Sequence, residues 1–171
     1  MSKARLKKTL KDMSQEELVE VICEIYDARK EAKEYFEYWL DPQPEKLVET
    51  VKKKLLKLFF ISEKTPRKSP AMADVRKVIA DFRTLCFEAD KTADVLLYAF
   101  ETYVQWLESR RKVMSHQEKA GRFRDTAEEY IAAYKLEPFF GIRLERAKER
   151  FDAVMRRGDL RAYSRRRWFG Y

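Results

Sequence analysis

The stretch from Met13 to Leu40 reads as one long amphipathic helix and constrains the fold more than any other part of the sequence. Ser14 and Glu17 have the spacing of a capping box, in which the serine hydroxyl accepts a backbone N–H and the carboxylate reaches back to the cap residue. The helical period then continues without glycine or proline as far as Pro42. We therefore predict a helix over residues 15–40, about 40 Å long at 1.5 Å per residue.

Apolar side chains occupy about half the circumference of this predicted helix. A ridge of carboxylates lies on the opposite side and consists of Glu16, Glu20, Glu24, Asp27, Glu31 and Glu34. Because one neighbour cannot cover so wide an apolar arc, we expect the helix to be packed between at least two others. Arg29 lies inside the arc, where its charged end either reaches water over a buried stem or forms a buried ion pair.

The rest of the chain keeps the same helical period between short polar or proline-containing breaks. Further helices are predicted at residues 3–12, 44–61, 70–86, 91–111, 115–134 and 139–157, with a loop at 62–69. The aromatic content of the 91–111 segment indicates a central place in the core, and Gly158 is predicted to end the last helix. The predicted class is all-α, with about seven antiparallel helices in either a closed bundle or an irregular array like that of helical-repeat proteins.

Length and cysteine usage predict a single helical domain, residues 1–171, in a cytoplasmic protein. A chain of this length buries roughly 70% of its unfolded surface and needs no disulfide or metal for a core. Cys23 and Cys86 lack CxxC spacing and a neighbouring histidine, which is typical of reduced structural thiols. Since no apolar run of about 18 residues occurs, neither a signal peptide nor a membrane association is predicted.

The net charge of +8 is distributed in blocks. Residues 1–12 carry +4 and residues 156–171 carry +5, whereas residues 13–45 carry −7 and residues 46–83 carry +7. Blocks of this kind indicate helices that complement one another electrostatically, or a basic face that meets an anionic partner.

The N-terminal part of the chain also resembles a known family. Residues 2–18 show the pattern SK..LKK.LK..S.EEL, and residues 33–42 show KEYFE..LDP. This is similar to a bacterial family of small all-helical proteins of unknown function, and the resemblance covers about the first hundred residues. It implies an all-helical intracellular protein. Because the family has no assigned activity, the resemblance implies no catalytic residue and no cofactor.

The sequence offers no set of residues that predicts catalysis. His116 is the one histidine, and its place beside a helix start predicts an exposed loop or first-turn residue. Neither HExxH nor ExxH occurs, and the carboxylate ridge has no histidine partner for a metal. The four glycines are too far apart for a phosphate-binding loop. We therefore predict a protein that is not an enzyme and uses no cofactor.

Two binding functions fit this sequence. The leading one is a helical interaction or scaffold protein that binds a protein or peptide partner. The alternative is nucleic-acid binding through the basic termini, where guanidinium groups contact phosphates and aromatic rings stack on bases. Its residues are Arg156, Arg157, Arg161, Arg165, Arg166, Arg167 and Trp168, and residues 158–171 form a basic aromatic tail. The tail can equally dock on the carboxylate ridge or remain in solvent.

Overall fold

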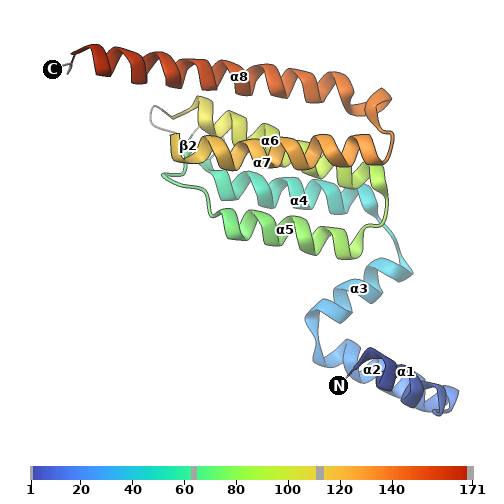
Figure 1. Cartoon of the computed structure of the whole chain (residues 1–171). Helices are drawn as coiled ribbons and strands as arrows, with labels where there is room; N and C mark the ends of the chain where they lie inside the picture. The colour runs from blue at the N-terminus through green and yellow to red at the C-terminus, as the bar shows by residue number, and fades with distance from the viewer. Residues whose placement is uncertain (1, 63–64, 111–113, 169–171) are drawn as a thin grey trace. The chain divides into compact units, whose positions relative to one another are not determined.

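The computed structural model describes residues 2–62, 65–110 and 114–168, and the side chains of these residues except 114–115 and 158–168. This part of the chain contains eight α-helices and one two-stranded sheet. The helices are α1 (Lys3–Lys11), α2 (Gln15–Ala28), α3 (Lys30–Leu40), α4 (Pro44–Phe59), α5 (Met72–Leu85), α6 (Ala89–Glu108), α7 (Met114–Ala133) and α8 (Glu137–Trp168). The chain divides into two compact units, Met1–Gln43 and Pro44–Tyr171 (Figure 1).

The all-α prediction is confirmed, but the described chain has eight helices rather than seven. The capping box forms as predicted: Ser14 Oγ accepts the Glu17 N–H at 3.2 Å, and Glu17 Oε2 accepts the Ser14 N–H at 2.7 Å. The predicted long helix is interrupted at Arg29, whose backbone is extended (φ −132°, ψ 114°). Arg29 thus ends α2 and precedes α3, although neither glycine nor proline marks the break.

The first unit has no buried side chain in α1, α2 or α3. Within the first unit itself, the wide apolar arc that we expected two neighbouring helices to cover is therefore not buried. On α2, Val19, Ile22 and Ile25 expose 53%, 45% and 46% of their surface. Arg29 is exposed, so the buried ion pair considered for it does not form. Within the unit α2 and α3 contact each other, and Tyr26 donates a hydrogen bond to Glu37 Oε1 at 3.3 Å.

The hydrophobic core lies in the second unit, where α4 to α8 run side by side (Figure 1). The aromatic helix α6 is central, as predicted: α4, α5, α7 and α8 all pack against it, and it buries apolar residues on most of its circumference. Its side chains of Phe100, Tyr103 and Trp106 are almost completely buried. Cys86 is buried as well, whereas Cys23 in the first unit is exposed, contrary to a purely structural role for both thiols.

A short β-hairpin replaces part of the predicted loop. Strand β1 (Phe60–Ser62) pairs antiparallel with β2 (Thr65–Pro66), so that Phe60 lies opposite Pro66. Strands this short show no alternating pattern, which is why the sequence did not reveal them. The prediction that Gly158 ends the last helix is also wrong, because α8 continues to Trp168. No helix in the described chain is long and apolar enough to cross a membrane.

Candidate functional site: the polar face of α6

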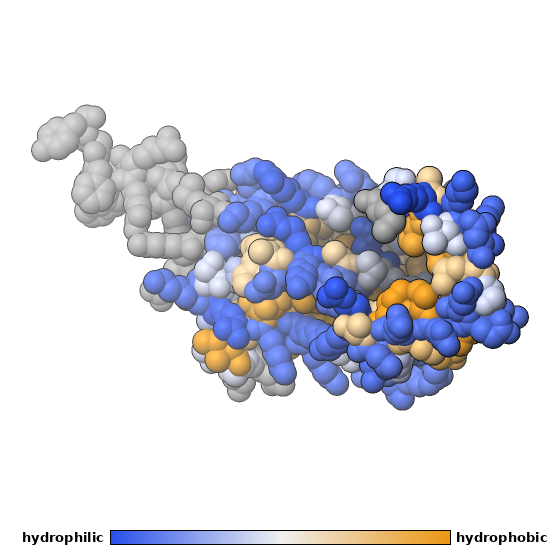
Figure 2. Space-filling view, turned by 90° about the horizontal axis from the view of Figure 1, so that it is seen from below, coloured by the Kyte–Doolittle hydropathy of each residue, from blue (hydrophilic) through white to orange (hydrophobic). Residues whose placement is uncertain are grey.

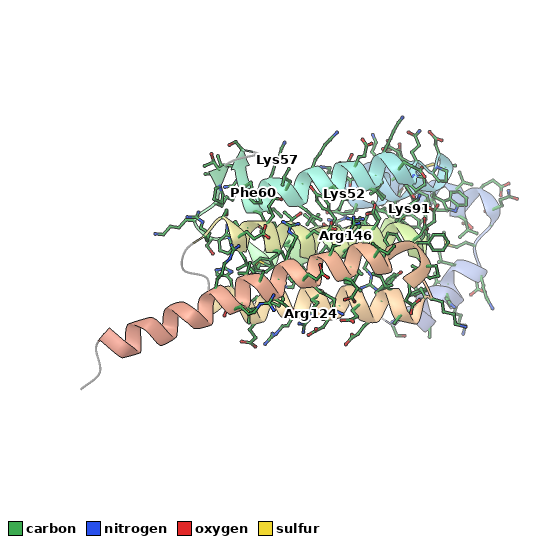
Figure 3. The ribbon with its side chains drawn as sticks, turned by 90° about the horizontal axis from the view of Figure 1, so that it is seen from above. Lys52, Lys57, Phe60, Lys91, Arg124 and Arg146 are labelled. Atoms are coloured by element: carbon green, nitrogen blue, oxygen red, sulfur yellow. The ribbon has the colours of Figure 1, made fainter. Side chains whose placement is uncertain are left out.

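One face of the central helix α6 remains partly uncovered and carries polar residues. Helices α4 and α8 pack on α6 far more closely than on each other, and Figure 3 shows them on either side of it. Because buried residues fill the other faces, the uncovered strip is a narrow one. We call it the α6 polar face, and its residues are Lys91, Asp94, Tyr98, Glu101, Gln105 and Glu108.

Four charged groups on and beside the α6 polar face form one ion-pair network. Arg143 of α8 donates to both oxygens of Glu101, with Nε 2.7 Å from Oε1, and to Asp94 Oδ1. Lys52 of α4 donates to the other oxygen of Asp94 at 2.6 Å. Its ammonium group also lies 5.4 Å from the ring centroid of Tyr98. Asp94 therefore links α4 and α8 across α6, and two cations balance two carboxylates.

The protonation states of this network do not favour acid–base catalysis. Burial alone would raise the pKa of Asp94, but hydrogen bonds from Lys52 and Arg143 outweigh burial and lower this pKa below its ordinary value. Burial opposes the charge of Arg143, yet the hydrogen bonds that it donates to Glu101 and Asp94 raise the pKa of the guanidinium. Since a general acid or base needs a pKa near the working pH, Asp94 is poorly suited to either role at neutral pH.

The ion pairs also fix how α8 lies on α6. Arg143 pairs with Glu101, and seven residues further along α8 Arg150 pairs with Glu108 at 2.6 Å. The residue numbers rise together on both helices, so α6 and α8 run parallel, each antiparallel to α7. Partly exposed pairs of this kind contribute on the order of 0–1 kcal/mol each. Their main effect is therefore on the alignment of the helices rather than on stability.

A second group of polar contacts lies at the hairpin end of the second unit, where α6 ends. Trp106 Nε1 donates to the backbone carbonyl of Arg67 at 2.8 Å, and Arg110 Nη2 donates to that of Pro66 at 2.8 Å. Arg67 Nε in turn donates to the carbonyl of Lys57 at 2.7 Å. The hairpin is thus tied both to the end of α4 and to the end of α6.

His116 is part of this end of the unit, in the first turn of α7. We predicted an exposed loop or first-turn residue; His116 is a first-turn residue, but its ring is partly buried and its Nδ1 lies 2.7 Å from the hydroxyl of Tyr103. Burial raises the pKa of Tyr103 well above its ordinary range, so the hydroxyl stays protonated, and the tautomer of the imidazole sets which of the two groups donates. Burial, helped by the charge of Lys119, lowers the pKa of His116. The neutral imidazole is therefore the form that fits this site.

This geometry predicts a pH effect on stability. Because the pKa of His116 is lower in the folded chain than its ordinary value of 6.5, its contribution to stability is complete above pH 6.5 and is lost as the pH falls through the folded value. We expect the melting temperature of the wild type to fall more between pH 7.5 and 5 than that of His116→Gln. Thermal unfolding followed by circular dichroism measures both. Parallel pH profiles for the two proteins would contradict the assignment.

The residues predicted to bind nucleic acid all lie on α8. Arg156 and Arg157 are exposed, whereas the side chains of Arg161, Arg165, Arg166, Arg167 and Trp168 lie outside the described part of the structure. Nucleic-acid binding through this run, and its docking on the carboxylate ridge, therefore remain predictions. Among the described residues no group of three or more histidine, cysteine, aspartate or glutamate side chains is arranged to hold a metal ion.

The fold and the polar contacts define a helical protein with a buried central helix and a structural ion-pair network. The chain belongs to DUF6155, a family of unknown function whose model matches residues 1–152. This confirms the resemblance to a family without an assigned function. The match ends before Arg156, so the arginine-rich run lies outside it. Neither a curated protein nor a solved structure matches the chain.

Proposed function

We propose that this protein is a non-enzymatic helical interaction protein that binds a helical segment of a partner through α2 and α3. The observation that carries this proposal is the absence of any buried side chain in α1, α2 and α3. Large apolar side chains of these helices are nevertheless exposed, and Figure 2 shows apolar areas among hydrophilic ones on the molecular surface. We call six of these exposed side chains on α2 and α3 the α2–α3 face. They are Val19, Ile22, Ile25, Tyr35, Trp39 and Leu40.

The size of the α2–α3 face suits a protein partner. Its six side chains expose between 38% and 73% of their surface. With about 200 Å² for a large side chain, they leave roughly 600 Å² of surface open. A standard interface buries about 800 Å² on each partner. Burial of this face would contribute roughly 15 kcal/mol to the free energy of binding, before the cost of the entropy lost on association is subtracted. Three short helices without a core gain stability mainly from such packing.

The charge of the first unit indicates the chemistry of the partner. The exposed carboxylates Glu16, Glu20 and Glu24 lie on the side of α2 opposite its apolar residues. Residues 1–43 together carry −2, but residues 13–43, which hold α2 and α3, carry −6, which attracts basic chains and repels acidic ones. The partner we propose is therefore an amphipathic helix whose apolar side is flanked by lysine or arginine. Such a helix would lie against α2 and α3 with its apolar side inward.

Site-specific photocrosslinking tests this proposal. A photoreactive amino acid at position 22 faces the apolar side of α2, and one at position 24 faces the carboxylate side. In cells that naturally make the protein, we expect a discrete adduct from position 22 and none from position 24. A synthetic peptide of the crosslinked segment should be basic and amphipathic and should bind the purified protein in calorimetry.

Two controls make the result decisive. Ile25→Asp places a charge in the apolar face and should abolish both the adduct and peptide binding, whereas Glu24→Gln, which removes one of several carboxylates, should keep the adduct and weaken peptide binding by less than threefold. Equal adducts from positions 22 and 24 would contradict the proposal, as would an adduct confined to the same chain. An adduct with a second copy of the protein would contradict a separate partner and would show instead that the α2–α3 face mediates self-association.

A further inference from the structure

We infer that the hairpin end of the second unit binds the phosphate backbone of a nucleic acid. Five cationic side chains lie on the elements that meet there. We call them the hairpin-end cations: Lys57, Arg67, Lys68, Arg110 and Lys119. Lys57 lies at the end of α4 beside Phe60 of β1, as Figure 3 shows. The site belongs to the part of the chain that the family model matches and differs from the arginine-rich run of α8.

The charge of the two units favours an anionic ligand for the second. Residues 44–155 carry a net charge of +5, to which the arginine-rich run of residues 156–171 adds another +5, whereas residues 1–43 carry −2. A surplus of this size attracts polyanions over several ångströms and raises the rate of encounter with them. The basic charge is therefore a property of the unit that holds the hydrophobic core.

Most of the partly buried cations of the second unit are neutralised by carboxylates, and the hairpin-end cations are not. Lys52, Arg143 and Lys148 are partly buried, and each forms an ion pair of 2.9 Å or less with a carboxylate of α6 or α7. In the described chain no carboxylate lies within 4.0 Å of a charged nitrogen of any hairpin-end cation. None of the described carboxylates therefore neutralises the positive charge of these five side chains.

Two of the hairpin-end cations are also held in place. Arg67 and Arg110 bond to backbone carbonyl oxygens, which fixes one side of each guanidinium without removing its charge. The guanidinium of Arg110 lies 5.9 Å from the ring centroid of Trp106, and its buried Nε has no hydrogen-bond partner in the described chain. Arg67 also neutralises the partial negative charge at the end of α4. Neutralising the end of α4 explains Arg67 alone and does not account for the exposed side chains of Lys57, Lys68 and Lys119.

The burial of Trp106 indicates which part of a nucleic acid this end of the unit can contact. Trp106 is only 1% exposed, so its ring is not open for stacking on a base. The hairpin-end cations offer charge and N–H donors, which match phosphate oxygens and carry little information about base sequence. We therefore expect binding that is independent of sequence and depends strongly on salt. If all five cations contact phosphates, affinity for duplex DNA should fall roughly 500-fold between 50 and 200 mM salt.

Fluorescence anisotropy of a labelled 20-base-pair DNA duplex with the full-length protein tests this inference. The variant combines Lys57→Ala, Lys68→Ala and Lys119→Ala, whose side chains form no described ion pair. We expect it to bind at least tenfold more weakly at 50 mM salt and to lower the slope of log affinity against log salt by about 2.7. Circular dichroism should show an unchanged fold.

A matched control separates a defined site from general positive charge. The combination of Lys46→Ala, Lys77→Ala and Arg146→Ala removes the same charge from exposed positions elsewhere on the second unit. It should change the affinity by less than threefold. Equal losses in the two triple variants, or no binding of the wild type at 50 mM salt, would overturn the inference. So would binding that is lost on truncation after residue 157 but kept in the hairpin-end variant. None of these outcomes affects the proposal for the α2–α3 face.

Discussion

Replacing Trp106 by alanine should lower the free energy of unfolding by about 3–5 kcal/mol. The indole is almost completely buried, and its ring centroid lies 4.7 Å from that of His116 and 6.1 Å from that of Tyr103. Its N–H group also satisfies the carbonyl of Arg67. The substitution therefore creates a cavity and releases the hairpin from α6 at the same time. Urea denaturation followed by circular dichroism measures the loss.

Two further variants separate the causes of this effect. Trp106→Phe keeps an aromatic ring but removes the N–H donor, so we expect a smaller loss of about 1–2 kcal/mol. Trp39→Ala removes the same side chain from the exposed α2–α3 face, where 64% of it is open to solvent. That variant should unfold within about 0.5 kcal/mol of the wild type. A comparable loss from Trp39→Ala would show that the first unit contributes to the core.

Removing residues 1–43 should abolish partner binding and leave the stability of the rest almost unchanged. The residues of the described core extend from Val48 to Val154, so the deletion removes none of them. We expect the fragment of residues 44–171 to unfold in one cooperative transition with nearly the urea midpoint of the full chain. A peptide of residues 1–43 should have low helicity by circular dichroism, because isolated short helices are marginal in water.

The opposite outcome for this fragment is equally informative. If its midpoint falls by more than about 1 M urea, the first unit stabilises the second and the α2–α3 face is not free for a partner. With a typical dependence of 1–3 kcal/mol per M, such a shift corresponds to at least about 1 kcal/mol.

The sequence predicted the helical class and the centre of the fold because both depend on side-chain periodicity. Apolar and aromatic residues recur on nearly every side of the segment that forms α6, and only a helix in the middle of the core can bury them all. The break at Arg29 left no such signal. Neither its neighbours nor its own type disfavours a helix, so its extended backbone depends on the packing of α2 against α3 rather than on local preference.

The candidate site was harder to foresee, because its partners are far apart in sequence. Arg143 lies 49 residues after Asp94 and 42 after Glu101, and which helices meet there depends on the parallel packing of α6 and α8. A usable signal was the seven-residue spacing of Asp94, Glu101 and Glu108, which places three carboxylates on one face of an apolar helix. No comparable spacing links His116 with Tyr103, because their contact depends on how α7 turns back along α6.

The seven-residue spacing of charges on α6 and α8 also restricts how these helices can misassemble. An apolar strip on α8 consists of Leu144, Ala147, Phe151 and Val154. Apolar contacts alone resist a shift of one helix along another only weakly. If α8 slid by one turn, about 5.4 Å, Arg143 could no longer bridge Asp94 and Glu101. Asp94 would keep Lys52 of α4, but Glu101 would be left partly buried without its counter-charge. The ion pairs thus select one register of α8 along α6 and destabilise registers that are shifted by one turn.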